Sequence, residues 1–115
     1  MANYVASLDR VFYALADPTR LAVLERLSEG PSSVSALSEP FDMALPTFLR
    51  HIEVLEAYGL IGTRKKGRIR TCFLEPSALF TVENWLSDRR ALWNGRLNRL
   101  GIYLDESKAT RRRKR

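Results

Sequence analysis

Five basic side chains lie within seven consecutive residues near the middle of the chain: Arg64, Lys65, Lys66, Arg68 and Arg70. Apolar or β-branched residues alternate through the same stretch, at Ile61, Thr63, Ile69, Thr71 and Phe73. This alternation predicts two β-strands joined by a turn at Lys66-Gly67, with the apolar side chains facing the body and the charges on the other face. A hairpin this basic repels itself unless it meets an anion. The pattern therefore indicates a ribbon that binds phosphate.

A second set of candidate contact residues lies on a predicted helix just before this ribbon. Its buried side is formed by residues at three- and four-residue spacing, which are Phe48, His51, Ile52 and Leu55. The helix is expected to run from about Ala44 to Tyr58, with Gly59 ending it. Its outward side then carries Leu45, Pro46, Leu49, Arg50 and Glu53, with Thr47 near the rim. This outward side is the candidate surface for contact with a ligand.

Arg50 is the strongest single candidate on that surface. Its guanidinium can donate two hydrogen bonds to one guanine, a pairing worth roughly 1 to 3 kcal/mol against a wrong base. A phosphate contact, or an ion pair within the helix to Glu53 or Glu56, is the alternative. Leu45 or Leu49 could contact the methyl group of thymine.

Two helical patterns at the start of the chain must help to position this surface. The first has its apolar face at Val5, Leu8, Phe12 and Leu15. The second begins at Asp17-Pro18, where an N-cap and a first-turn proline occur together, and ends at Gly30-Pro31. Its expected buried stripe is Leu21, Leu24 and Leu27.

A short third helix is predicted next, capped by Ser32 or Ser33 and ended by Pro40. Its apolar residues are Val34 and Leu37. Because only a tight turn separates it from the helix that begins near Ala44, the two together indicate a helix-turn-helix.

A long last helix is predicted from Glu75-Pro76-Ser77 to about Leu104. Its apolar flank is Leu79, Leu86, Trp93 and Leu100, which fall seven residues apart, beside Val82, Leu97 and Leu104. A chain of 115 residues has little core to cover this flank, so we expect a second copy to cover it together with the first helix. The expected interface residues are Tyr4, Leu8, Phe12, Leu86, Trp93, Leu97 and Leu100. The alternative is that the helix folds over its own core.

Length and charge limit the class of protein. The net charge of +6 is segregated: residues 1–63 hold four basic and eight acidic side chains, and residues 64–115 hold fifteen and five. We expect one domain at 1–105 and a basic, disordered tail at 106–115. No apolar run approaches the length of a membrane span, so we expect a cytoplasmic protein with no membrane partner. The single cysteine, Cys72, cannot form an internal disulfide.

Two motifs carry a family resemblance. Asp17-Pro18-Thr19-Arg20-Leu21 opens the second helix, and the run from Leu45 to Leu55 is followed by Gly59-Leu60-Ile61. In this order and spacing the chain resembles the ArsR/SmtB (arsenic-repressor) family of bacterial regulators. The resemblance implies a mainly helical winged helix-turn-helix fold with a small β-hairpin, in the order α-α-α-α-β-β-α. It further implies a homodimer, formed through the first and last helices, that binds an inverted-repeat operator in double-stranded DNA and represses transcription.

The chain departs from the family at several positions. Many relatives sense metals through a Cys-Val-Cys motif on the third helix or through ligands on the last helix. Ser33-Val34-Ser35 stands at the first of these places, and a neutral hydroxyl is a poor zinc ligand. The one histidine, His51, is expected to pack against its neighbours, so we predict no metal and no cofactor. Ala44 and Leu49 stand where relatives commonly carry serine, so the base contacts must differ.

Other functions were weighed against DNA binding. An enzyme needs a convergent acid, base or nucleophile, and neither His51 nor Cys72 has a partner for such a role, so no enzyme is expected. A winged-helix module that binds RNA or another protein is the alternative. Neighbouring arginines could lower the pKa of Cys72 and make it a redox switch, although a buried strand cysteine without a signalling role is the simpler interpretation. The sequence does not indicate whether a small-molecule effector exists.

Overall fold

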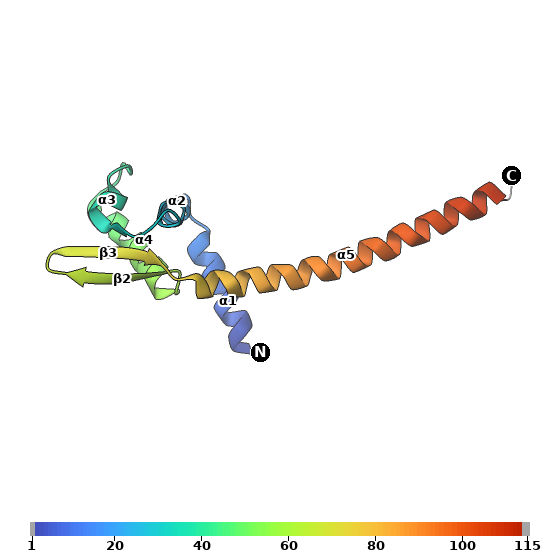
Figure 1. Ribbon diagram of the computed structural model, residues 1–115, viewed down its shortest axis with the longest axis horizontal. Coiled ribbons are helices and arrows are strands. Elements are labelled where there is room, and N and C mark those ends of the chain that lie inside the picture. Colours follow the sequence, from blue (N-terminus) through green and yellow to red (C-terminus); the bar gives the residue numbers. More distant parts are fainter. Residues whose placement is uncertain (1, 114–115) are drawn as a thin grey trace. The chain divides into compact units, whose positions relative to one another are not determined.

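The computed structural model describes residues 2–113, with side chains described from Leu8 to Glu106. Its elements are α1 (Ala2–Leu15), α2 (Pro18–Leu27), β1 (Ser32–Ser33), α3 (Val34–Ser38), α4 (Leu45–Ala57), β2 (Ile61–Lys66), β3 (Ile69–Leu74) and α5 (Pro76–Arg113). They fall into two units, the residues up to Val82 and those from Glu83 onward. Figure 1 labels the elements along the chain. Each predicted helix is present, and so are both strands of the predicted hairpin.

The strand β1 was not predicted from the sequence. Its residues Ser32 and Ser33 pair antiparallel with Cys72 and Thr71 of β3, and the sheet has the order β1-β3-β2. Ser33 is also the N-cap of α3, because its hydroxyl accepts a hydrogen bond from the Ala36 amide at 3.1 Å. The predicted order α-α-α-α-β-β-α is therefore incomplete, since two polar residues carry no alternation that could reveal a strand.

The buried faces of α1 and α2 differ in part from those predicted. The core side of α1 is Leu8, Val11 and Ala14, and that of α2 is Val23, Leu24 and Leu27. Leu21, predicted to belong to the buried stripe of α2, is 47% exposed, and Phe12, predicted as an interface residue on the apolar face of α1, is 38% exposed. Steps of three and of four residues return to nearly the same helix face, so the periodicity alone does not decide which neighbour packs. Val5 lies outside the residues whose side chains are described.

Two backbone hydrogen bonds fix the end of α4. The Gly59 amide donates to the carbonyl of Glu56 at 3.1 Å, and the Leu60 amide donates to the carbonyl of Leu55 at 2.9 Å. This pair of bonds requires a left-handed residue between them, and Gly59 supplies it with a φ of +78°. The chain then turns directly into β2, and Leu60 is fully buried at the corner. The end of α4 is thereby tied to the start of the hairpin.

The centre of the first unit is filled by eight large, fully buried side chains. They are Val23, Leu37, Phe48, Ile52, Leu55, Leu60, Ile61 and Cys72, from α2, α3, α4, the corner after α4 and two strands. Three of the eight lie on α4, so this helix contributes most to the packed centre. Truncating one such side chain in a close-packed core costs about 2 to 5 kcal/mol. The core therefore fixes which face of α4 remains outside.

Candidate nucleic-acid interface

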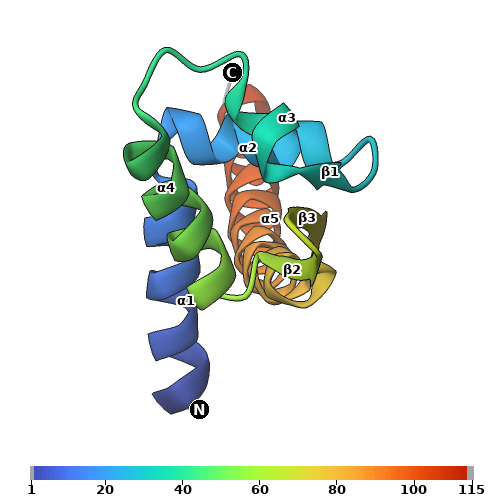
Figure 2. The ribbon, with the colours of Figure 1, turned by 90° about the vertical axis from the view of Figure 1, so that its left-hand side faces the viewer.

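The helices α3 and α4 and the loop between them form the predicted helix-turn-helix. The loop is visible as the long connection between the two helices in Figure 2. Phe41 in the loop packs on Phe48 of α4, with ring centroids 5.4 Å apart, and Phe48 is fully buried. This aromatic pair anchors the turn between α3 and α4.

The outer face of α4 matches the prediction at most positions. Leu45, Pro46, Thr47, Arg50 and Glu53 are exposed, and Leu49 is half-buried. Ala44 is the N-cap and makes no side-chain cap hydrogen bond, as expected from the missing hydroxyl. Among residues 8–106, Arg50 makes no ion pair to Glu53 or Glu56, so its exposed guanidinium remains available for a ligand.

The basic hairpin formed by β2 and β3, here called the wing, has a two-residue turn at Gly67 and Arg68. Lys66 pairs with Ile69 across the turn, and Gly67 has the φ of +62° that a tight hairpin turn needs at this place. Arg64, Lys65, Lys66 and Arg68 are all exposed. The wing thus presents four exposed cations close to one turn.

The prediction that all wing charges share one face is wrong. The register pairs Thr63 with Cys72 and Lys65 with Arg70 on one face, and Arg64 with Thr71 and Lys66 with Ile69 on the other. Successive strand residues point to opposite faces, so three consecutive basic residues cannot lie on the same side. In β3 the core-facing residue is Cys72, which is fully buried, whereas Ile69 is 61% exposed. The β3 residues predicted to face the core were therefore wrong by one position along the strand.

Arg70 differs from the other wing cations because it has an internal partner. It is half-buried, and its Nη2 donates to Oε1 of Glu56 on α4 at 2.9 Å. The Thr63 hydroxyl donates to the other oxygen of the same carboxylate. Glu56 thereby connects both strands of the wing to α4. The main role of Arg70 is to stabilise the position of the wing against this helix. Its predicted role as a phosphate contact does not agree with this arrangement.

Cys72 is unsuited to the redox role that the sequence left open. Burial raises the pKa of its thiol above the ordinary value, and Arg70 lowers the pKa by less than burial raises it. The reactive thiolate is therefore disfavoured. Its burial among core side chains agrees with the simpler interpretation, a structural strand cysteine.

A groove of about 660 Å³ lies between α4 and the wing. It is lined by Ser33, Val34 and Ser35, by Leu45 and Leu49 of α4, and by Lys65, Arg68, Ile69 and Arg70 of the wing. Its lining includes three cations and no acidic residue, beside several aliphatic side chains. Such a lining suits a ligand that carries negative charge along an otherwise uncharged body, as a sugar-phosphate strand does.

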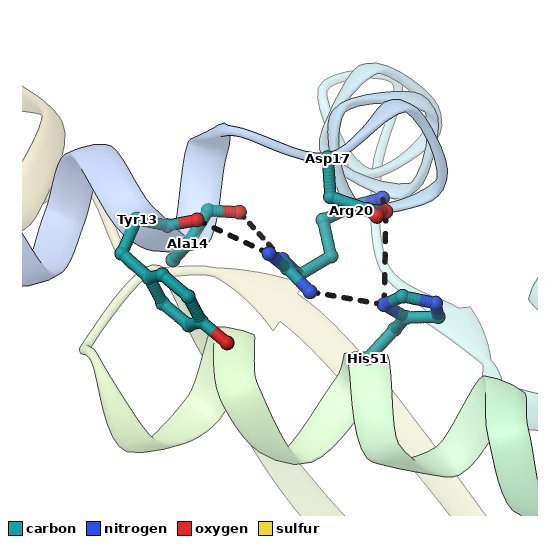
Figure 3. A network of polar contacts seen from close by, with 5 residues as sticks. All are labelled: Tyr13, Ala14, Asp17, Arg20 and His51. Carbon is teal, nitrogen blue, oxygen red and sulfur yellow. Dashed lines mark hydrogen bonds and ion pairs between the residues drawn. The ribbon is translucent and has the colours of Figure 1, made fainter.

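A polar network that was not predicted from the sequence links α4 to the first two helices (Figure 3). Arg20 is only 7% exposed, and its guanidinium reaches the carbonyls of Tyr13 and Ala14 and the ring of His51. His51 also lies 3.6 Å from the carboxylate of Asp17. The lone histidine of the chain was correctly expected to pack against neighbours. The sequence carries no signal for this contact, because arginine side chains are mostly exposed and the burial of Arg20 depends on packing between distant segments.

The predicted self-association residues have different surroundings. Leu8 is buried within its own subunit, which removes it from the candidate set, and Tyr4 lies outside the described side chains. Within residues 83–106 the exposed predicted residues are Leu86, Trp93, Leu97 and Leu100, each between 50% and 59% exposed. The same segment also exposes Leu92, Ile102, Tyr103 and Leu104. Exposed apolar residues therefore crowd this part of α5.

Two further properties concern the described residues alone. None of their helices combines the length and the apolar character that crossing a membrane requires. No three of their histidine, cysteine, aspartate or glutamate side chains come together in a group that could hold a metal ion.

Comparison with known proteins places this geometry in a family context. A family model described as a helix-turn-helix domain matches residues 15–64. The HTH-type transcriptional regulator Rv2034 of Mycobacterium tuberculosis is 38% identical over 105 residues, which are 91% of this chain and 94% of that protein. A crystal structure of an ArsR family transcriptional regulator, RHA00566, is 54% identical, with a TM-score of 0.75 over 77% of this chain and 92% of the other.

A third comparison concerns assembly. The solution structure of Mb0332 from Mycobacterium bovis is described as a homodimeric winged helix-turn-helix DNA-binding domain of a possible ArsR-family regulator. It is 26% identical, with a TM-score of 0.62 over 79% of this chain and 86% of that one. Its name thus describes a winged helix-turn-helix domain that forms a dimer of two identical subunits.

Proposed function

The chain belongs to the ArsR family of winged helix-turn-helix DNA-binding transcriptional regulators, and we propose that it acts as a homodimeric repressor of an inverted-repeat operator. The observation that carries the proposal is the combination of an exposed α4 face with four exposed wing cations. A repressor of this kind needs no catalytic group, and it acts in the cytoplasm, where bacterial DNA lies. Occupying a promoter would exclude RNA polymerase.

In this proposal α4 enters the major groove of DNA. In helix-turn-helix proteins the second helix of the motif lies in the major groove, and the residues of its outer face contact the base edges. Arg50 reads a guanine through its free guanidinium, while Leu45 and Leu49 contact thymine methyl groups. The two leucines make the surface less polar than one that carries serine, which favours a different operator from those of serine-bearing relatives.

The wing neutralises phosphates beside the major groove. Arg64, Lys65, Lys66 and Arg68 supply charge with little sequence discrimination, because phosphates are the same at every base pair. One sugar-phosphate strand of the DNA then lies in the protein groove between α4 and the wing. Its phosphates meet Lys65 and Arg68, and its sugars meet the aliphatic side chains.

A second copy of the chain covers the apolar part of α5 between Glu83 and Glu106. Soluble monomers rarely expose so many large apolar side chains on one element, and the name of Mb0332 records a homodimer for the same fold. Closed two-fold symmetry would present two α4 helices about 34 Å apart, one helical turn of DNA. The operator is then an inverted repeat.

The direct test is selection of bound duplexes from a random 30-base-pair pool. The expected result is enrichment of an inverted repeat whose half-sites are one turn apart. Arg50→Ala should lose discrimination at one base pair of each half-site, by about 5- to 150-fold per half-site, and should bind mixed-sequence duplex almost as the parent does. Arg10→Gln is the matched control, because Arg10 lies beside Tyr58 and Gly59 at the opposite end of α4 from Leu45.

Two outcomes would contradict the proposal. If the pool yields no enriched sequence, the chain is not an operator-binding regulator of the proposed kind. If single-stranded RNA of the same length competes as well as the enriched duplex, the RNA-binding alternative replaces it.

A further inference from the structure

The geometry points to Arg20 and His51 as positioning residues that set how α4 is presented to DNA, through a hydrogen bond that requires a proton acceptor at Nδ1 of His51. This inference rests on the proposed DNA-binding function and deepens it. Neither residue lies on the outer face of α4 or on the wing. They act through the joint between α1, α2 and α4 (Figure 3).

Arg20 is first of all the cap of α1. Its Nε donates to the carbonyl of Ala14 at 2.7 Å, and its Nη2 donates to the carbonyl of Tyr13 at 3.1 Å. The Ala14 carbonyl lies four residues before Pro18, which has no amide hydrogen to donate, so Arg20 supplies its partner. The Tyr13 carbonyl also accepts from the Ala16 amide at 3.1 Å, and Arg20 is a second donor there. The guanidinium also lies 5.3 Å from the centroid of the Tyr13 ring. Arg20 is therefore held firmly against the end of α1.

The remaining terminal nitrogen of Arg20 is directed at α4. Its Nη1 lies 3.1 Å from Nδ1 of His51. Arginine stays protonated in proteins and can only donate, so Nδ1 must be the acceptor and the ring proton must sit on Nε2. Because the planar guanidinium is already fixed by two carbonyls, it offers this third bond in one direction only.

The start of α2 gives His51 a second neighbour. The Asp17 carboxylate oxygen Oδ2 lies 3.6 Å from the same Nδ1, and it accepts a hydrogen bond from the Arg20 amide at 3.0 Å as the N-cap of α2. Arg20 and Asp17 are the charged groups that meet His51 from the elements packed against it. With the Nδ1 lone pair facing Arg20, the Asp17 carboxylate is a neighbour of His51 and not its hydrogen-bond partner.

This bond matters for α4 because it is a polar contact beside Arg50, whereas the polar contacts of Glu56 with the wing lie near the other end of the helix. Phe48, Ile52 and Leu55 hold α4 against the core, and apolar packing is weakly directional. A hydrogen bond constrains direction to within a few tens of degrees. His51 follows Arg50 in the sequence, so a small rotation or slide of α4 at this bond changes where the Arg50 guanidinium meets a base edge. Bidentate contacts tolerate little misplacement.

Two substitutions separate positioning from simple loss of packing. His51→Asn keeps an acceptor oxygen close to the place of Nδ1 and cannot take up a proton. His51→Leu keeps volume and removes the acceptor. Both are compared with the parent on two probes, a duplex that the parent selects from a random pool and a mixed-sequence duplex of equal length. The measured quantity is the ratio of the two affinities.

At pH 8 the ratio should fall about fivefold in His51→Leu, the equivalent of one net hydrogen bond, and stay within twofold of the parent in His51→Asn. A purely space-filling role of the ring predicts the opposite order, because leucine replaces its volume and asparagine does not. The ratio is used because contacts to phosphate contribute equally to the affinity for any DNA.

The outcomes distinguish this inference from the proposed function. If the parent selects no duplex, the proposed function fails. If the parent selects one, yet His51→Leu keeps the parent ratio, the positioning role fails alone. Thermal unfolding of each variant shows whether it is folded at the assay temperature. Should His51→Leu be unfolded there, His51→Gln replaces it, because the glutamine amide reaches the place of Nε2 and not that of Nδ1; a ratio in His51→Gln equal to that of the parent would then overturn the positioning role.

Discussion

Replacing Arg68 with glutamine should change the salt dependence of DNA binding and leave the sequence preference nearly intact. Arg68 lies in the turn of the wing, is exposed and lines the groove beside α4. Glutamine keeps a polar side chain and removes only the charge. Arg70 is unsuitable for this purpose, because its ion pair with Glu56 would also be lost.

The expected magnitude follows from counterion release. The logarithm of the binding constant falls with the logarithm of salt concentration by about 0.9 for each phosphate neutralised. One charge per subunit is two per dimer, so Arg68→Gln should make the slope shallower by about 1.8, and by about 0.9 if a single subunit binds. Adding Lys65→Gln should double the change. The measurement therefore also counts the subunits on the DNA.

The assay is fluorescence anisotropy of a labelled 30-base-pair duplex in a series of potassium chloride concentrations. The matched control is Arg10→Gln, which removes the same charge from α1 and should leave the slope unchanged. Equal slopes for Arg68→Gln and the parent would refute the idea that the wing meets phosphates. Equal changes in Arg68→Gln and Arg10→Gln would mean that only the net charge matters.

Three other predictions follow from burial and packing. Since burial raises the pKa of the Cys72 thiol, the folded state holds that proton more tightly than the unfolded chain, so stability against urea should decline as pH rises above about 8.5, and Cys72→Ala should lack this part of the decline. In Gly62→Ala the new Cβ would lie 2.5 Å from Cζ of Phe73, so the ring must move, and calorimetry should detect a loss of about 1 to 3 kcal/mol. An unchanged melting temperature would mean that the Phe73 ring moves freely. Leu97→Glu should convert a dimer to a monomer in light scattering, and a parent that is monomeric at micromolar concentration would contradict the proposed pairing through α5.

The long and strongly patterned elements were predictable from sequence. The helix from about Ala44 to Tyr58 was located to within one residue at each end, because its apolar spacing is regular and Gly59 is the left-handed residue that its end requires. The hairpin was located equally well, since Gly67 marks its turn. Both signals, a periodicity over more than ten residues and a glycine at a turn, lie within the segment that they describe. The sequence of that segment is therefore enough to predict the element.

The sequence did not predict in the same way which residues of β3 face the core, or that β3 pairs with β1. Thr71 and Phe73 look like core-facing strand residues, yet the small residue Cys72 between them is the one that is buried. That choice depends on the register with β2 and on β1, whose Ser32 and Ser33 pair with Cys72 and Thr71. The register of a strand depends on neighbouring strands that are distant in the sequence. The sequence of one strand alone therefore does not predict it.

The family motif and the candidate interface turn out to be separate parts of the molecule. Asp17-Pro18-Thr19-Arg20-Leu21 carried much of the resemblance, and its polar residues are used inside the protein: Asp17 caps α2, and Arg20 caps α1 and contacts His51. The positions of α4 that we propose to face DNA bases lie elsewhere, and one of them, Leu49, departs from the usual serine. Because the joint that holds α4 does not include these proposed contact residues, they can change while α4 keeps its place. A shared motif at the joint therefore identifies the architecture and predicts nothing about the operator, which must be found by selection.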